Sequence, residues 1–242
     1  MPYTMSLVVL LLLAELVGLT VVGLSITWFA KYGGGFALDK TGKEFNLHPV
    51  FMALGFLFFN GNSLMTYRIL GNNVHRLFAK IVHFLLQLVA LICASFGLAC
   101  VFQFHNANSI PNMYSLHSWL GIATYSFFCL QLLLGLTLFL IMAVFSPNSM
   151  TNLRKFYLHF HVYGGVLIFV MAGAASLLGT AEKISFSIPN YDQLPPVAVV
   201  ANFFGVFIIL FVGLVCYVLY SDKFKTAPNT DREYREQINV EQ

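Results

Sequence analysis

The sequence predicts an all-α membrane protein with six transmembrane helices, in which helices two to five form a four-helix core. The chain is 58% hydrophobic and only 10% charged, whereas a soluble domain typically carries about 25% charged residues. Six apolar segments reach the ~20 residues that a spanning helix needs. Four successive segments also carry a histidine near their start. Together these features exclude a soluble globular domain.

The six apolar segments are residues 6–30, 48–69, 81–103, 117–144, 159–180 and 199–220. The first is too long for a signal peptide and has no basic region before it, so we expect a retained helix. Pro49 suits the first turn of the second helix and marks its start. We expect one membrane domain over residues 1–222 and a polar, disordered cytosolic tail over residues 223–242.

The distribution of Lys and Arg predicts that both termini are cytosolic. In this orientation the cytosolic segments hold nine basic residues and the opposite side holds four, as the positive-inside rule requires. The loop at 103–116 contains no Lys or Arg. The net charge of +3 is small and forms no basic face, which argues against nucleic-acid binding.

His48, His83, His117 and His161 follow one another at spacings of 35, 34 and 44 residues, each about one membrane crossing plus a loop. Helices that cross in alternate directions place His48 with His117 at the non-cytosolic side and His83 with His161 at the cytosolic side. Two facing imidazoles can ligate a haem iron from both faces, which favours electron transfer over oxygen chemistry. The pattern therefore predicts two haems, one near each surface.

Glycines support this interpretation, because a flat macrocycle needs bare backbone beside its ligands. Gly121 and Gly165 each follow a histidine by four residues, and Gly55 follows one by seven. Glycines at these offsets lie on the same helix face as the histidine. Ordinary packing of small residues between helices is the alternative for each glycine.

Two further histidines leave alternatives open. His159 lies two residues before His161, so only one of them can face the bundle; the adjacent Gly164 and Gly165 favour His161. His105 lies at the outer end of the third helix. It could bind a substrate or a metal ion there, or it could be an interfacial histidine with no binding role.

Basic residues on the cytosolic side lie in register with the histidines. Arg76 and Lys80 precede His83 by seven and three residues, and Arg154 precedes His161 by seven. These cations can hold an anionic electron donor or haem propionates. The alternative is contact with lipid headgroups.

Several motifs resemble the cytochrome b561 family over residues 30–225. They are FNLHPV at 45–50, YR at 67–68, Lys80 with His83, FHN at 104–106, PNMYSLHSWLG at 111–121, HVYGG at 161–165 and AEK at 181–183. The resemblance implies two haem b groups, with the same histidine pairs, and one-electron transfer from cytosolic ascorbate to monodehydroascorbate or a ferric chelate. We expect helices one and six to pack outside the four-helix core and to provide the interface of a homodimer.

The resemblance also implies roles for particular residues. The ascorbate contacts fall on Arg76, Lys80 and Arg154, and the outer substrate contacts on His105 and Asn106. Haem contacts fall on Arg68, Asn112, Met113, Tyr114, Ser115, Glu182 and Lys225. The sequence departs from the family at Arg76, where some relatives have Lys, and in a longer segment before Arg154.

Two other functions compete with this prediction. Quinol-linked cytochromes commonly stack both haem ligands on one helix, whereas each helix here contributes one. A haem-binding transporter or structural protein without turnover would show broken helices or a polar midplane, and the midplane residues are chiefly Gln87 and Gln131. Glu15 in the first helix has no assigned partner. A plasma membrane and an endomembrane vesicle or lysosome both fit the sequence.

Overall fold

The computed structural model describes residues 5–70, 74–146 and 149–221, and all regular structure in these ranges is helical. Within them, six helices are long and apolar enough to cross a membrane. The predicted fold class is therefore confirmed. The proposed tail over residues 223–242 lies outside the described residues.

The six spans contain the following elements. The first joins α1 (Met5–Thr27) to the π-helical segment η1 (Trp28–Tyr32), and the second joins α2 (Gly42–Phe45), α3 (Leu47–Met52), η2 (Ala53–Phe59) and α4 (Asn60–Leu70). The third is α5 (Arg76–Ala107). The fourth joins α6 (Leu116–Gly135) to η4 (Leu136–Ile141), before the short α7 (Met142–Phe145). The fifth is α8 (Thr151–Ser187), and η5 (Tyr191–Gln193) leads to the sixth, α9 (Pro196–Tyr220).

Three of the six spans begin five or more residues earlier than the apolar runs predict. The second span begins at Gly42, α5 begins at Arg76 and α8 begins at Thr151. The reason is that polar residues beside an apolar run can continue its helix, since the backbone satisfies its own hydrogen bonds in water as well as in lipid. His83 and His161 consequently lie well inside their helices rather than at the first turn.

Local capping explains where several helices begin. Ser115 and Ser118 form a capping box at the start of α6, and the His75 side chain accepts a hydrogen bond from Leu77 N at the start of α5. Such caps satisfy backbone N–H groups that have no partner within the helix. Pro196 occupies the first turn of α9, where its missing N–H costs nothing.

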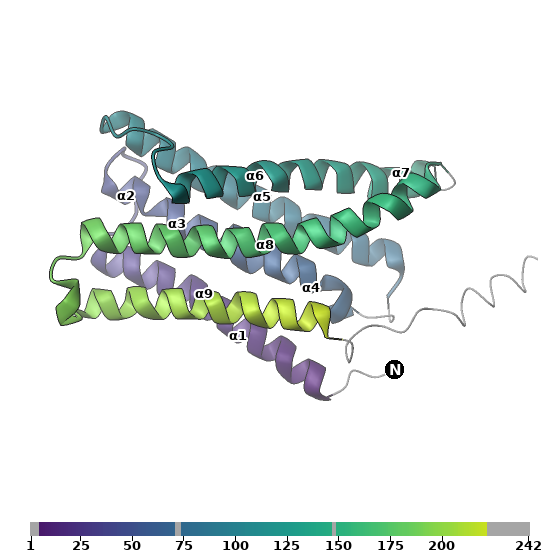
Figure 1. Cartoon of the computed structure of the whole chain (residues 1–242), viewed down its shortest axis with the longest axis horizontal. Helices are drawn as coiled ribbons and strands as arrows, with labels where there is room; N and C mark the ends of the chain where they lie inside the picture. The colour runs from purple at the N-terminus through teal and green to yellow at the C-terminus, as the bar shows by residue number, and fades with distance from the viewer. Residues whose placement is uncertain (1–4, 71–73, 147–148, 222–242) are drawn as a thin grey trace, which may run out of the picture.

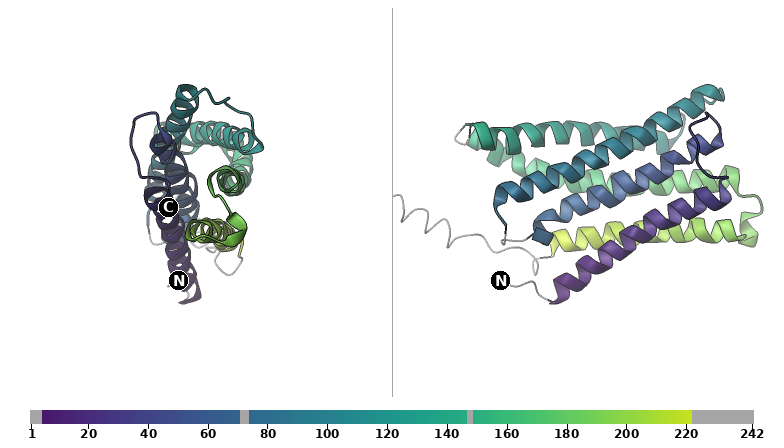
Figure 2. Two further views of the ribbon diagram at one scale, coloured as in Figure 1. Left: turned by 90° about the vertical axis from the view of Figure 1, so that its left-hand side faces the viewer. Right: turned by 180° about the vertical axis from the view of Figure 1, so that it is seen from behind.

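The helices pack lengthwise, with α1 and α9 side by side on one flank of the bundle and α6 with α8 on another (Figure 1). Seen from behind, α1 crosses the bundle obliquely (Figure 2). A Cβ atom at Gly18 would lie 2.8 Å from the Phe211 ring, so this glycine permits the close approach of α1 to α9. α1 and α9 thus pack beside the predicted core of spans two to five.

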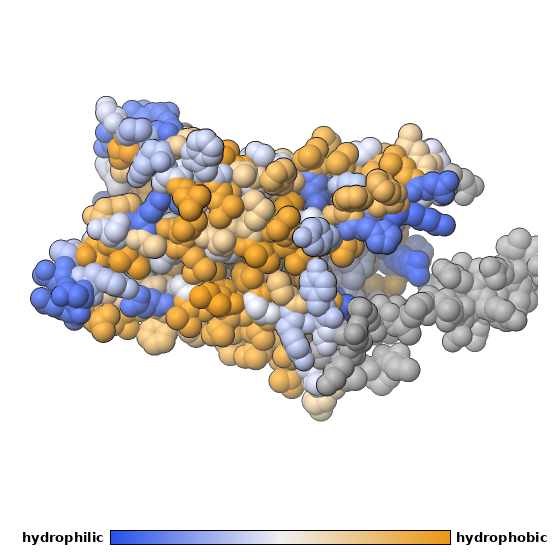
Figure 3. Space-filling model, viewed as in Figure 1, coloured by the Kyte–Doolittle hydropathy of each residue, from blue (hydrophilic) through white to orange (hydrophobic). Residues whose placement is uncertain are grey.

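The surface matches a membrane-embedded bundle. Figure 3 shows hydrophobic residues over the middle of the molecule and hydrophilic residues gathered toward both ends. Leucines within the spans, such as Leu12, Leu16 and Leu130, are exposed. An apolar band between polar ends is what a bilayer requires of a lipid-facing surface.

Candidate functional site

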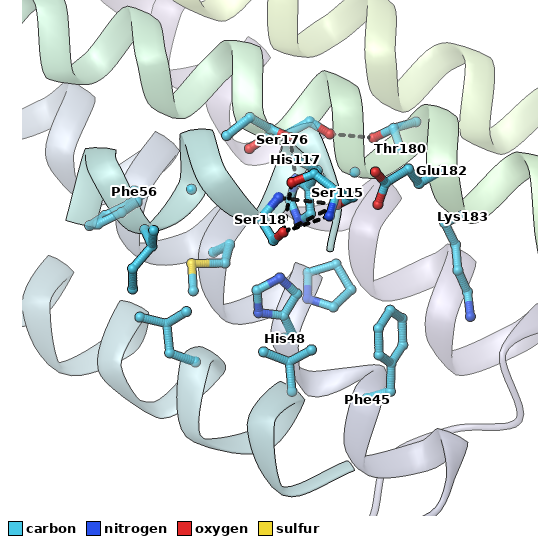
Figure 4. A pocket seen from close by; sticks show the side chains of 18 of the residues that line it. Phe45, His48, Phe56, Ser115, His117, Ser118, Ser176, Thr180, Glu182 and Lys183 are labelled. Atoms are coloured by element: carbon cyan, nitrogen blue, oxygen red, sulfur yellow. Dashed lines mark hydrogen bonds between the residues drawn. The ribbon is translucent and has the colours of Figure 1, made fainter. Parts of the chain in front are cut away.

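The first histidine pair faces a pocket between the second, fourth and fifth spans. The rings of His48 on α3 and His117 on α6 have centroids 6.1 Å apart and planes at 77° (Figure 4). His48 Nδ1 lies 3.1 Å from the carbonyl oxygen of Gly97, and His117 Nδ1 lies 2.8 Å from that of Ala175. A carbonyl only accepts, so each Nδ1 donates a proton and each Nε2 keeps a lone pair. We call this the His48/His117 pocket.

The second pair lies at the other end of the same bundle. His83 on α5 and His161 on α8 also have ring centroids 6.1 Å apart, with planes at 69°. His83 Nδ1 lies 2.9 Å from both the carbonyl oxygen and the Oγ of Ser63. His161 Nδ1 is buried without a hydrogen-bond partner among the described residues, and its ring packs against Phe139 and Tyr157 instead. We call this the His83/His161 pocket.

The separation within each pair fits two imidazoles on opposite faces of one metal ion. A metal–imidazole bond is about 2.0–2.1 Å long, and with a ring centre about 1.1 Å beyond the nitrogen the two centroids would be roughly 6.3 Å apart. Both observed values are 6.1 Å. In the described residues no group of three or more His, Cys, Asp or Glu could hold a metal ion. The donor set therefore fits a haem iron, whose other ligands are its own macrocycle nitrogens.

Two glycines that the sequence analysis missed leave room for the imidazoles. A Cβ atom at Gly179 on α8 would lie 2.7 Å from His117 Cε1, and one at Gly135 on α6 would lie 2.9 Å from His161 Cε1. Each glycine belongs to the helix opposite the histidine that it accommodates. Residue spacing within one helix cannot predict a contact between a glycine on one helix and a histidine on another. Only the packing of the two helices shows such a contact.

The glycines that the sequence did single out differ from one another. Gly121 lines the His48/His117 pocket, where an added Cβ atom would meet nothing within 4 Å, and Gly165 lines the His83/His161 pocket. At Gly55 an added Cβ atom would lie 2.7 Å from Cys93 Cβ on α5. Gly55 therefore serves helix packing, the alternative that the sequence left open.

Basic side chains gather around the His83/His161 pocket. Besides the two histidines, its lining includes four predicted basic residues and a fifth that was not predicted: Arg68, Arg76, Lys80, Arg154 and, as the fifth, Lys155. No Asp or Glu lines this pocket in the described part of the chain. Arg68 Nη2 donates a hydrogen bond to the Leu219 carbonyl at 2.7 Å, which ties the second span to the end of α9. The pocket can therefore bind an anion.

Predicted residues of the other side line the His48/His117 pocket. They are His105, Asn112, Met113, Tyr114, Ser115 and Glu182. The His105 ring stacks on the Tyr114 ring with centroids 6.5 Å apart. Asn106 does not line the pocket, but it accepts a hydrogen bond of 2.7 Å from Asn112 Nδ2. Lys183 also lines this pocket and was not predicted.

The segment before α6 is held in a defined conformation. Met113 has a left-handed backbone with φ of 59°, and its carbonyl accepts a 2.8 Å hydrogen bond from Trp119 Nε1. The Ser115 capping box follows directly. These contacts position Tyr114 at the mouth of the pocket.

Two other candidates lie apart from the pockets or outside the described chain. His159 is exposed, lines neither pocket, and has its Nδ1 3.2 Å from the Lys155 carbonyl oxygen on its own helix. His161 is the one of the two that faces the bundle. Lys225 lies outside the described residues.

Polar side chains within the spans pair with one another. Gln131 Nε2 donates to the His161 carbonyl at 2.9 Å, and Gln87 Nε2 donates to Asn60 Oδ1 at 3.1 Å. Glu15, unexplained by the sequence, accepts a hydrogen bond of 3.5 Å from Asn62 on α4. Gln87 and Gln131 both line the His83/His161 pocket.

Known proteins resemble this chain over most of its length. A family profile described as eukaryotic cytochrome b561 matches residues 47–187. The plasma membrane ascorbate-dependent reductase CYBRD1 of Xenopus tropicalis is 37% identical over 223 residues, covering 91% of this chain and 77% of the relative. The transmembrane ascorbate-dependent reductase CYB561 of Homo sapiens is 34% identical over 221 residues, covering 91% and 85%. That of Bos taurus is 35% identical over 207 residues, covering 85% and 79%.

Proposed function

Because this chain belongs to the cytochrome b561 family, we propose that it is a transmembrane oxidoreductase that carries single electrons from ascorbate to an acceptor across the membrane. The observation that carries the proposal is the repetition of one geometry. Two histidine pairs, each with centroids 6.1 Å apart, lie at opposite ends of one membrane-spanning bundle. One such histidine pair would hold a single cofactor. Two pairs at opposite ends of the bundle would hold two cofactors and so provide a route for electrons.

Each pair would hold one haem b, with His48 and His117 as ligands at one end and His83 and His161 at the other. When bound, haem supplies reversible one-electron chemistry at its iron. The protein contributes the orientation of the ligands. The Nδ1 hydrogen bonds of His48, His83 and His117 select the tautomer that aims Nε2 at the metal and raise its basicity.

The His83/His161 pocket would receive ascorbate. Ascorbate is an anion at neutral pH, and the cationic side chains of Arg76, Lys80 and Arg154 line this pocket. Charge-assisted hydrogen bonds from such cations are about twice as strong as neutral ones. Lys155, which also lines the pocket, adds a further positive charge.

The orientation follows from the same charges. Both ends of the described chain lie at the end of the bundle that holds the His83/His161 pocket (Figure 1). The positive-inside rule assigns the more basic end to the cytosol. We therefore propose that this pocket opens to the cytosol, and that the His48/His117 pocket opens to the opposite side.

The acceptor at the His48/His117 pocket would be monodehydroascorbate or a ferric chelate, since either takes a single electron. His105 lines this pocket and Asn106 lies beside it through Asn112, and we propose both as acceptor contacts. Arg68 and Glu182 would contact haem at their respective pockets, and so would the segment from Asn112 to Ser115. Lys225 remains a sequence prediction, as does the homodimer.

An absorption spectrum of the purified protein, oxidised and then titrated with ascorbate, tests the proposal when haem is also quantified per chain. We expect two low-spin b-type haems per chain that ascorbate reduces. The proposal would be contradicted if protein purified from cells supplied with haem contained no haem. Bound haem that ascorbate cannot reduce would contradict it equally. A transporter or structural role would then explain the fold better.

A further inference from the structure

Lys183 is the only Lys or Arg among the described residues that line the His48/His117 pocket. The pocket also contains one acidic side chain, Glu182, so its charged lining nearly cancels. The two residues are neighbours on α8 and their side chains leave the helix in different directions (Figure 4). Lys183 is thus the single positively charged side chain in the described lining that can attract an anion to this pocket.

The Lys183 ammonium group has aromatic rings as neighbours instead of hydrogen-bond acceptors. Its Nζ lies 4.4 Å from the centroid of Phe45 and 5.4 Å from that of Phe186. An ammonium has three donors, and a ring face satisfies it only weakly. Within the described residues Nζ makes no hydrogen bond or ion pair, so its donors remain available to a ligand.

The aromatic contacts connect Lys183 to the rest of the pocket. The Phe45 ring packs against the His48 ring at 6.3 Å and against Phe104 at 5.3 Å, and Phe104 is followed in the chain by His105. His105 in turn stacks on Tyr114. The Phe45 ring therefore contacts both the Lys183 ammonium and the His48 ring, so an anion held by Lys183 would be one aromatic ring away from His48.

We propose that the Lys183 ammonium binds a carboxylate or enolate group in the His48/His117 pocket and makes this end of the protein selective for anions. The inference rests on the proposed function, because it assigns Lys183 to the acceptor end. The anionic group has two possible sources, a soluble acceptor and the carboxylates of a haem bound in the pocket.

A redox titration of the purified holoprotein, with and without citrate as a non-reducing carboxylate probe, tests the proposal. The signal of the haem in this pocket is identified by its loss in His48→Ala. Citrate will also bind the basic pocket at the other end, so the readout is the midpoint potential of this one haem. Citrate bound beside it should lower that potential, because negative charge favours the oxidised iron.

Lys183→Met separates the two sources. For either source, the midpoint potential without citrate falls, because a positive charge beside the iron is lost. For a soluble anion, the citrate concentration that gives half the further shift also rises about tenfold, as loss of a single charged contact predicts. For a haem carboxylate, the citrate response stays as in the wild type. Lys183→Arg should restore either property because it keeps the charge.

Lys43→Met is the matched control. Lys43 lies at the same end of the molecule, is exposed and does not line the pocket, and its loss changes the net charge equally. A Lys183→Met protein that matches Lys43→Met in both potential and citrate response would overturn the inference. Wild-type protein that lacks a haem reducible by ascorbate would instead overturn the proposed function, so the two failures are distinguishable.

Discussion

The two pockets hold their histidine pairs at the same centroid separation of 6.1 Å, yet they differ in charge and in room. The His83/His161 pocket encloses about 870 Å³ and has five basic residues and no acidic residue in its described lining. The His48/His117 pocket encloses about 160 Å³ and has one of each. The separation of the histidine rings is thus common to both ends, and the two pockets differ in the charge and volume of their linings.

This difference suggests how one fold separates a donor from an acceptor. Symmetric ligand pairs suit an electron route that is reversible in principle. On the proposed function, the five basic residues of the His83/His161 pocket would raise the local concentration of an anionic donor at that end. We expect the direction of electron flow to depend on which substrates the two mouths attract, and less on the ligands themselves.

The largest expected effect comes from removing a ligand at one end. His117→Ala should abolish haem binding in the His48/His117 pocket and leave the other haem in place, and His83→Ala should do the reverse. Haem per chain and the low-spin electron paramagnetic resonance signals measure this. Retention of both haems in either variant would show that the pairing is wrong.

Removing basic residues from the His83/His161 pocket should have the second largest effect. The double variant Arg76→Ala/Lys80→Ala should raise the KM for ascorbate about 100-fold, because each charged hydrogen bond contributes roughly 1.5 kcal/mol at the low end of its range. Haem content should stay unchanged. Lys40→Ala/Lys43→Ala removes two charges from the opposite end and serves as control. Equal ascorbate kinetics in both double variants would contradict the donor site.

A methyl group at a contact glycine should weaken one end selectively. Gly179→Ala places Cβ 2.7 Å from the His117 ring, and overpacking of this kind costs about 1–3 kcal/mol. We expect the haem of the His48/His117 pocket, and only that haem, to show lower occupancy or to be lost at a lower temperature. Gly213→Ala on α9, where a Cβ atom meets nothing within 4 Å, is the control. Identical behaviour of the two variants would mean that the backbone there has room to shift.

The smallest effect should come from the hydroxyl beside His83. Ser63→Ala removes the Oγ, which lies 2.9 Å from His83 Nδ1 and donates a hydrogen bond of 2.9 Å to the His83 carbonyl oxygen, but it leaves the Ser63 carbonyl 2.9 Å from Nδ1. Each neutral hydrogen bond contributes about 0.5–1.5 kcal/mol, so we expect a small change in the midpoint potential of one haem. Ser95→Ala, whose hydroxyl bonds Leu91 and Tyr125 instead, should leave that haem unaltered. A shift in both haems would indicate a general structural change.

Much of the architecture could be predicted because a bilayer imposes strong and simple requirements. The six spans are evident as apolar runs, and alternate crossing directions place His48 with His117 and His83 with His161. The basic residues around His83 could be predicted from helical periodicity. Helix ends were less predictable: α8 begins at Thr151 because its polar first turns continue the helix beyond the apolar run.

The sequence by itself determined the class of the protein, the four histidines that face one another and the basic character of one end, since these depend on local composition and period. Only the tertiary structure decided which neighbours complete each site. Gly179 opposite His117, the Gly97 and Ala175 carbonyls, and Lys183 on Phe45 all lie on helices distant in the chain. Contacts of this kind depend on the rotation and approach of packed helices, which no spacing within a single helix encodes.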